Sequence, residues 1–197
     1  MIKRPNIIPA FLPVQSYGLS SNGFKPRSPV VSWSGIAQHY FSNNEAKDRF
    51  NLQENWQLMY DMGQKPHNRL YGFYDGRRLG ISAHFMIGRG GEILQLVPLE
   101  FRSHHAGVSS FNGLKNCNDF MIGIENIGAY NVAYTEMQYQ SNAWLCSWLM
   151  QEYPGITLDN NVGHEHIAPG RKKDPGPSFD WDYLRTLITE QTNGLAA

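Results

Sequence analysis

The sequence lacks the marks of several protein classes. It contains 2 cysteines in 197 residues, Cys117 and Cys146, and no C-x-x-C pair, which argues against a disulfide framework or a thiolate metal clip. We expect both to be reduced, structural thiols. Apolar runs stay well short of the roughly 18 residues that span a bilayer. The 17 basic residues equal the 17 acidic ones, so no overall field would attract nucleic acid or an anionic membrane.

The N-terminus also lacks a clear export signal. Lys3 and Arg4 precede an apolar run, but Asn6, Pro9 and Pro13 interrupt it, and no small-residue cleavage site follows cleanly. We therefore predict a cytoplasmic protein. Release or export to the cell wall as a lysin is the alternative.

What the sequence does have is an ordinary core and many turns. Hydrophobic residues make up 41% and aromatic residues 13%, alongside 19 glycines and 11 prolines, a balance typical of a packed, loop-rich globular protein. The length suits one domain. We place that domain at residues 29–190. It follows an extended arm at 1–28, rich in Pro, Ser, Gly and Asn, and precedes a tail at 191–197.

Hydrophobic periodicity predicts the elements of the first half. β-Branched and aromatic residues within 29–42 favour a strand that ends in a histidine. A helix is expected near 53–62, followed by an irregular loop up to residue 80. Two apolar runs within 81–98 flank the glycines of 88–91. Because glycine supplies the positive φ of a tight turn, this stretch predicts a β-hairpin.

The second half is predicted to add one strand and two helices. The apolar segment 119–128 favours a strand buried on both faces. Thr135 followed by Gln138 is a capping-box signature at the start of a helix over 136–152. Asp180 can cap a last helix. The residues that share one face of that helix are Trp181, Leu184, Leu187 and Ile188. Strands alternating with helices indicate an α/β domain with a mixed central sheet flanked by helices.

Four residues form the plausible metal-ligand set, namely His39, His164, His166 and Asp174. Imidazole and carboxylate ligands suit Zn²⁺, and a catalytic zinc keeps a fourth position for water. Three of the four lie in "GHEHIAPGRKKDPG", yet no H-E-x-x-H helix signature accompanies them. Spacing alone leaves open both a metal site and a histidine-rich loop without metal.

Two further histidines are interpreted as structural. His84 has alternating apolar neighbours, which favours a satisfied histidine in the core or behind a site. His67 lies in a polar stretch and is expected to be solvated.

The charged candidates also allow two interpretations each. Glu125 is the only acid in the apolar run "FMIGIENIG", and it is either a salt-bridged core acid or a general base of raised pKa. Arg171, Lys172 and Lys173 precede Asp174. They are either a solvated charge run or contain one lysine that stabilises an oxyanion.

Four stretches within residues 81–190 carry a resemblance to a known family. They read "ISAHFMIGRGGEILQLVP", "HHAGVSSFNGLKNCNDFMIGIENIG", "YTEMQYQ" and "GHEHIAPGRKKDPGPSFDW". Together they resemble the type 2 zinc N-acetylmuramoyl-L-alanine amidases, in particular the AmpD branch. The resemblance implies the fold that this family shares with phage amidase lysozymes and peptidoglycan recognition proteins.

The resemblance also implies residue roles. His164 and Asp174 would ligate one Zn²⁺ per chain. His39, as the histidine at the end of the first strand, would be the remaining protein ligand. Lys172 would lie beside the metal-bound water, and Glu125 matches the catalytic acid of the family.

Other residues of the motifs receive lesser roles. His105 and Ala106 match the "HAG" stretch that lines the substrate in this family. His166 stands where the branch commonly has aspartate, so the resemblance gives it no ligand role. Arg171 and Lys173 are left as solvated charges.

The chain departs from the AmpD branch at two positions associated with gripping the anhydro-sugar. Tyr40 stands where that branch usually has asparagine, and Asn116 stands where it usually has arginine. Lys115 could partly substitute for the missing arginine. The preference for an anhydro-sugar is therefore left open.

The expected activity is that of an N-acetylmuramoyl-L-alanine amidase. It would hydrolyse the amide between N-acetylmuramic acid, or its 1,6-anhydro form, and L-alanine. Its partner would be peptidoglycan or peptidoglycan fragments, and the chain is expected to be a monomer. The zinc would lower the pKa of its water and polarise the carbonyl. Glu125 would move the proton and Lys172 would stabilise the oxyanion.

Two alternatives differ in setting or in class. One is a phage or wall-lytic amidase that acts on intact peptidoglycan. The other is a module that binds peptidoglycan without cutting it, and the presence of Asp174 argues against that class, in which a ligand is commonly lost.

Overall fold

A mixed six-stranded sheet forms the centre of the computed structural model, which describes residues 2–12, 19–20, 23–24, 32–42, 48–64 and 81–193. The strand order is β1-β6-β5-β9-β4-β10. The strands are β1 (Ile7–Pro9), β4 (Gly35–Phe41), β5 (Phe85–Ile87), β6 (Ile93–Gln95), β9 (Met121–Ile127) and β10 (Asn161–Gly163). β5 and β6 are antiparallel, and the other neighbours are parallel. The predicted α/β fold with a mixed sheet is confirmed.

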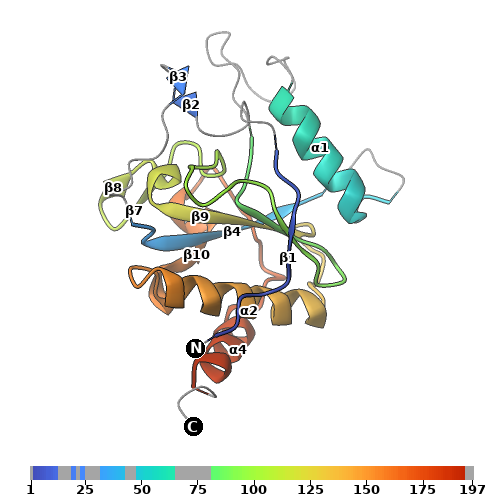
Figure 1. The fold of residues 1–197 in the computed structure, drawn as a ribbon, viewed down its shortest axis with the longest axis vertical. Coiled ribbons are helices and arrows are strands. Elements are labelled where there is room, and N and C mark those ends of the chain that lie inside the picture. Colours follow the sequence, from blue (N-terminus) through green and yellow to red (C-terminus); the bar gives the residue numbers. More distant parts are fainter. Residues whose placement is uncertain are drawn as a thin grey trace.

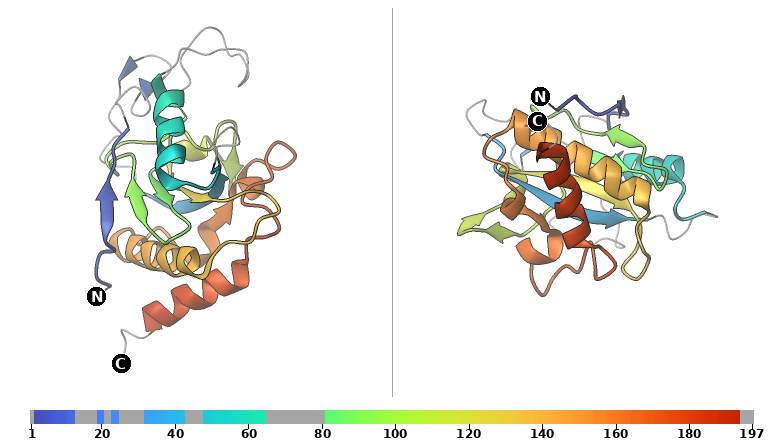
Figure 2. Two further views of the ribbon diagram at one scale, coloured as in Figure 1. Left: turned by 90° about the vertical axis from the view of Figure 1, so that its right-hand side faces the viewer. Right: turned by 90° about the horizontal axis from the view of Figure 1, so that it is seen from below.

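Helices cover both faces of the sheet. α2 (Glu136–Glu152) and α4 (Trp181–Asn193) lie on one face, and α1 (Leu52–Gln64) lies on the opposite side (Figures 1 and 2). The larger core cluster fills the space between the sheet and the α2–α4 layer. A second cluster lies under α1, where Met59 packs with Met86 and Leu96.

Short elements complete the described part of the chain. Two small antiparallel pairs join β2 (Leu19–Ser20) to β3 (Gly23–Phe24) and β7 (Ser110–Phe111) to β8 (Leu114–Lys115). The short helices are η3 (Cys117–Asp119), η4 (Leu158–Asn160) and α3 (His164–Ile167). Figure 1 shows the β7–β8 pair beside the end of the sheet that carries β10.

The elements predicted from local signals are confirmed. The hairpin closes with the Gly88 amide donating to the Glu92 carbonyl at 2.9 Å, and Gly91 has a φ of 83°. α2 spans the predicted residues. Its capping box joins the Gln138 amide to Thr135 Oγ1 at 3.1 Å and the Thr135 amide to Gln138 Oε1 at 3.1 Å.

The remaining helices and strands follow the sequence with small differences. α1 runs one residue earlier and two later than expected. α4 is capped by Asp180, whose Oδ1 accepts from the Tyr183 amide at 2.9 Å. The strand expected to end in a histidine instead continues two residues beyond His39, because Tyr40 and Phe41 keep pairing with β9. β9 is buried on both faces, as predicted.

The N-terminal segment joins the sheet. Residues 7–9, placed by the sequence analysis in an extended arm, form β1 and pair with β6 as an edge strand. The loop predicted up to residue 80, with His67, lies outside the described residues. Cys117 and Cys146 are free and buried, as expected. Among the described helices, none has the length and apolar character needed to cross a bilayer.

Candidate metal centre

The parallel pairing of β4 and β9 brings two functional side chains to one face of the sheet. In this register His39 lies opposite Glu125. Because side chains alternate between the faces of a sheet, both point away from α2. Both are buried, with exposed fractions of 1% and 6%.

His164 and Asp174 reach the side chain of His39 from segments that follow β10, the strand on the other side of β4 from β9. His164 is the first residue of α3 and follows directly on β10, which pairs with β4. The backbone carbonyl of Asp174 accepts from the Glu165 amide at 3.0 Å, and the next carbonyl, that of Pro175, accepts from the Tyr134 hydroxyl at 2.9 Å. These bonds fix the loop that carries the carboxylate.

The three side chains converge on one point. His39 Nδ1 and His164 Nδ1 are 2.9 Å apart, and each lies 2.9 Å from Asp174 Oδ2. Four tetrahedral bonds of zinc length would separate neighbouring ligand atoms by about 3.3 Å. The cluster is therefore within a few tenths of an ångström of what a zinc ion requires.

Hydrogen bonds on the far side of each ring indicate where its proton lies. His105 Nε2 faces the Met121 carbonyl at 3.1 Å and must donate to it, so His105 Nδ1 accepts from His39 Nε2 at 3.0 Å. His164 Nε2 lies 3.1 Å from the Ala106 carbonyl and donates in turn. Both Nδ1 lone pairs then face the carboxylate of Asp174. Three acceptors that face one another in this way are suited to binding a cation.

The electrostatics of the site agree with this arrangement. Burial, and then the neighbouring His164, lower the pKa of His39 to about 4, against the opposing effect of Asp174. The ring of His39 is therefore neutral at neutral pH, as a metal ligand must be.

Glu125 is a buried acid with an unused oxygen. Its Oε2 has no hydrogen-bond partner among the described residues. Burial raises the pKa of Glu125 well above the ordinary value, the charge of Asp174 adds to the increase, and Lys172 opposes it. A carboxyl with a raised pKa beside an acceptor cluster has the properties of a general base, whereas the salt-bridged core acid allowed by the sequence would have a lowered pKa.

Arg171 is exposed, as predicted for a solvated charge, but its guanidinium also bonds to the backbone. Its Nη2 donates to the Ala106 carbonyl at 2.5 Å and to the Val108 carbonyl at 2.7 Å, and its Nε donates to Val108 at 3.1 Å. The planar guanidinium fork allows these parallel bonds, which a lysine could not make. Lys172 and Lys173 are exposed.

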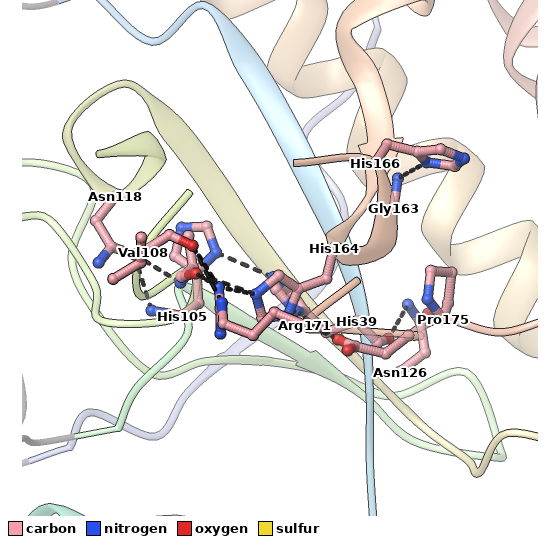
Figure 3. Close-up of polar contacts among 12 residues, drawn as sticks. His39, His105, Val108, Asn118, Asn126, Gly163, His164, His166, Arg171 and Pro175 are labelled. Atoms are coloured by element: carbon pink, nitrogen blue, oxygen red, sulfur yellow. Dashed lines mark hydrogen bonds and ion pairs between the residues drawn. The ribbon is translucent and has the colours of Figure 1, made fainter. Parts of the chain in front are cut away.

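The other predicted residues lie around the cluster or outside it. His166 is exposed and accepts from the Gly163 amide, turned away from the cluster (Figure 3). His84 is buried, with Nδ1 accepting from Gly123 and Nε2 facing the Phe101 carbonyl, as expected of a supporting histidine.

The residues predicted to contact substrate differ in exposure. Lys115 is exposed on β8. Tyr40 packs against the core cluster on the α2 side, the sheet face opposite His39. His105 and Ala106 are buried. Asn118, which the sequence analysis did not single out, accepts from both of their amides through Oδ1, at 3.0 and 2.8 Å.

Comparison with known proteins identifies the family of the chain. The family model for N-acetylmuramoyl-L-alanine amidase matches residues 29–177. The chain is 51% identical over 115 residues to the 1,6-anhydro-N-acetylmuramyl-L-alanine amidase AmpD of Citrobacter freundii, and the match covers 58% of this chain and 61% of that protein. The chain thus spans about three fifths of the length of that curated relative.

Solved structures give the same result. A crystal structure of a selenomethionine AmpD derivative superposes with a TM-score of 0.74 at 36% identity, over 94% of this chain and 96% of that one. AMPDH3 from Pseudomonas aeruginosa, solved in complex with anhydromuramic pentapeptide, gives a TM-score of 0.61 at 25% identity, over 86% and 65%. The chain therefore belongs to the N-acetylmuramoyl-L-alanine amidase family.

Proposed function

We propose that this chain is a zinc-dependent amidase that hydrolyses the bond between N-acetylmuramic acid and the L-alanine of a stem peptide. The observation that carries the proposal is the cluster of His39, His164 and Asp174, in which two imidazole lone pairs and a carboxylate oxygen meet at 2.9 Å. In this proposal His39 Nδ1, His164 Nδ1 and Asp174 Oδ2 hold the ion.

The chemistry divides between the ion and the chain. When bound, zinc would supply Lewis acidity, which polarises the scissile carbonyl and makes water more acidic. Glu125 takes a proton from the attacking water as its oxygen bonds to the carbonyl carbon. It then delivers the proton to the L-alanine nitrogen as the C–N bond breaks. Its buried setting suits both steps, because a raised pKa lets one carboxyl accept and return a proton near neutral pH.

Lys172 is assigned to the developing oxyanion. Its charge opposes the increase in the pKa of Glu125 and also lowers the pKa of His39, so its ammonium lies close enough to influence both groups. A fixed positive charge beside a tetrahedral oxyanion stabilises the transition state more than the substrate.

The proposed substrate is a soluble muropeptide, with the 1,6-anhydro form accepted. The AmpD relative is named for that sugar, and the Pseudomonas structure contains an anhydromuramic pentapeptide. Of the predicted substrate contacts, the exposed Lys115 remains a candidate. His105 and Ala106 lie buried behind the histidine cluster, and Tyr40 packs on the opposite face of the sheet. The cell compartment proposed for this reaction is the cytoplasm, where soluble fragments would be recycled.

A wall-lytic enzyme is the second candidate. It is favoured by Tyr40 and Asn116, which stand at positions that grip the anhydro-sugar in the AmpD branch. Asn116 is held at a φ of 62° at the end of β8, so its backbone conformation, as well as its side chain, would shape this part of the site.

One comparison separates these readings. The zinc-loaded protein is incubated with anhydro-muropeptide, with the corresponding reducing muropeptide and with intact sacculi, and released stem peptide is measured by mass spectrometry. Glu125→Gln protein of equal zinc content is the control. We expect faster release from the soluble substrates. Faster release from sacculi would favour the lytic enzyme, and binding without release from any substrate would overturn the proposal.

A further inference from the structure

We infer that the two-residue segment His105–Ala106 is a positioning element that fixes the direction and the protonated nitrogen of both histidine ligands, and that Arg171 locks this segment in place. The inference rests on the proposed function, because it takes His39 and His164 to be metal ligands. It gives His105 and Ala106 a role behind the metal instead of a direct contact with substrate.

The two ligands are held by consecutive residues. The ring of His105 accepts from His39 Nε2, and the backbone carbonyl of Ala106 accepts from His164 Nε2. The two acceptors belong to adjacent residues, His105 through its ring and Ala106 through its backbone carbonyl, so they move together when this segment is displaced. A shift of the segment would therefore misdirect both ligands at once.

The ring of His105 fits only because of its neighbour on β9. A Cβ atom at Gly123 would lie 2.5 Å from His105 Cγ, far inside van der Waals contact. On its other edge, the ring donates to the Met121 carbonyl at 3.1 Å. The sheet thus supplies both the space for the ring and the acceptor that selects its protonated nitrogen.

The backbone of the segment is held from two sides. Asn118 Oδ1 accepts from the amides of His105 and Ala106. Arg171 donates to the carbonyls of Ala106 and Val108. Val108, two residues beyond Ala106, is 78% exposed, so the guanidinium of Arg171 restrains the chain at a point where packing does little.

A competing arrangement of protons exists at His164. Arg171 Nη2 lies 3.4 Å from His164 Nε2 and would donate to it if the proton sat on Nδ1 instead. That arrangement would leave the bare Nε2 only 3.1 Å from the Ala106 carbonyl, with two acceptors in contact. The shorter distance therefore favours the proton on Nε2 and the lone pair toward the metal.

The first measurement is zinc affinity, by competition with a chromophoric chelator. His105→Ala and Arg171→Met should each weaken zinc binding by about 10–100-fold, the usual cost of losing a group that orients a metal ligand. His105→Asn should recover most of the loss, since its Oδ1 can accept from His39. Lys173→Met is the matched control for Arg171→Met, because Lys173 is exposed two residues away, and it should leave the affinity unchanged.

The second measurement needs no metal. Histidine ¹⁵N chemical shifts of the zinc-free protein distinguish the Nε2–H from the Nδ1–H form of each ring. We expect Nε2–H for His39 and His164 in the wild type, a mixture at His39 in His105→Ala, and a mixture at His164 in Arg171→Met. If His105→Ala does not fold, Arg171→Met and the milder Gly123→Ala, which displaces the ring without removing it, carry the test.

The outcomes separate this inference from the proposed function. Zinc affinities of His105→Ala, or of Arg171→Met and Gly123→Ala in its place, within twofold of the wild type would overturn it. Nδ1–H rings in the wild type would also overturn it. If the wild type shows Nε2–H rings that respond to the variants but binds no zinc, the positioning element stands and the proposed function fails.

Discussion

Gln38 and His39 are neighbours on β4 whose side chains face opposite sides of the sheet, and they differ in the hydrogen-bond partners that surround them. Gln38 points toward α2, where its amide donates to Asn142 and Asn161 and accepts from Asn126 and Asn142. Each of its polar atoms has a partner of the opposite kind. His39 points to the other side, where its Nδ1 meets only other acceptors.

The difference separates structural from functional burial. Buried polar groups normally find partners within the chain, as the amides around Gln38 do. On the opposite face, His39 Nδ1, His164 Nδ1 and Asp174 Oδ2 crowd together, and Glu125 Oε2 has no partner among the described residues. That face is the one at which we propose that a cation and a substrate bind.

The largest effect is expected from removing the negative charge of Asp174 on the sheet face that carries His39. Asp174→Asn keeps the shape of the side chain but loses the anionic ligand, so zinc should be lost on gel filtration and stem-peptide release should fall to background. Metal content by mass spectrometry and a muropeptide assay measure both. Stoichiometric zinc in the purified variant would remove Asp174 from the ligand set.

Glu125→Gln should leave the metal in place and stop proton transfer. We expect turnover to fall by about 10²–10⁴-fold, the usual contribution of a general acid–base group, with zinc content unchanged. Steady-state kinetics at matched zinc content provide the measurement. Turnover within threefold of the wild type would exclude Glu125 as the base.

A substitution on the α2 side of the sheet, among the hydrogen-bonded amides around Gln38, should change the stability of the protein but not its turnover. Asn142→Leu removes partners from Gln38 and Asn126 in the interior. It should lower the free energy of unfolding by about 1–3 kcal/mol, the cost of stranding buried polar groups, while zinc affinity stays the same. Urea unfolding and chelator competition test the two halves. A loss of zinc affinity without a loss of stability would contradict the division between the faces.

The smallest expected effect is a pH-dependent gain in the stability of Glu125→Gln relative to the wild type. The pKa of Glu125 is higher in the folded protein than its unfolded value of about 4.3, so the folded state binds the proton more tightly. The contribution of Glu125 to the stability of the zinc-free wild type should therefore fall as pH rises from about 4 through the raised pKa. Glu125→Gln has no such proton, so its advantage in thermal midpoint should grow with pH. An advantage that is constant between pH 5 and pH 8 would contradict the raised pKa.

Local signals made much of the fold predictable. The capping box of Thr135 and Gln138 gives the start of α2, and the glycines of 88–91 give the hairpin turn, since both depend on a few adjacent residues. The pairing of β1 with β6 was not predicted, because it joins residues about 86 positions apart (93 − 7 = 86) and leaves no periodic trace in a three-residue strand.

The site was predictable in part for a similar reason. Spacing alone left four metal-ligand candidates, and the family resemblance reduced them to the three that meet in the structure. Arg171 was missed because its partners are backbone carbonyls, which carry no sequence signal. The one sequence signal for this role is that position 171 carries an arginine where the next two residues are lysines, since arginine alone can make bidentate hydrogen bonds.

The most direct test of the metal site is a zinc titration of protein stripped with a chelator, followed both by release of stem peptide and by the ¹⁵N shifts of His39 and His164. The account predicts no release without metal, full release at one equivalent of zinc per chain, and a shift of both Nδ1 resonances over the same range. Full activity of the stripped protein, or recovery without a change at either Nδ1, would contradict it.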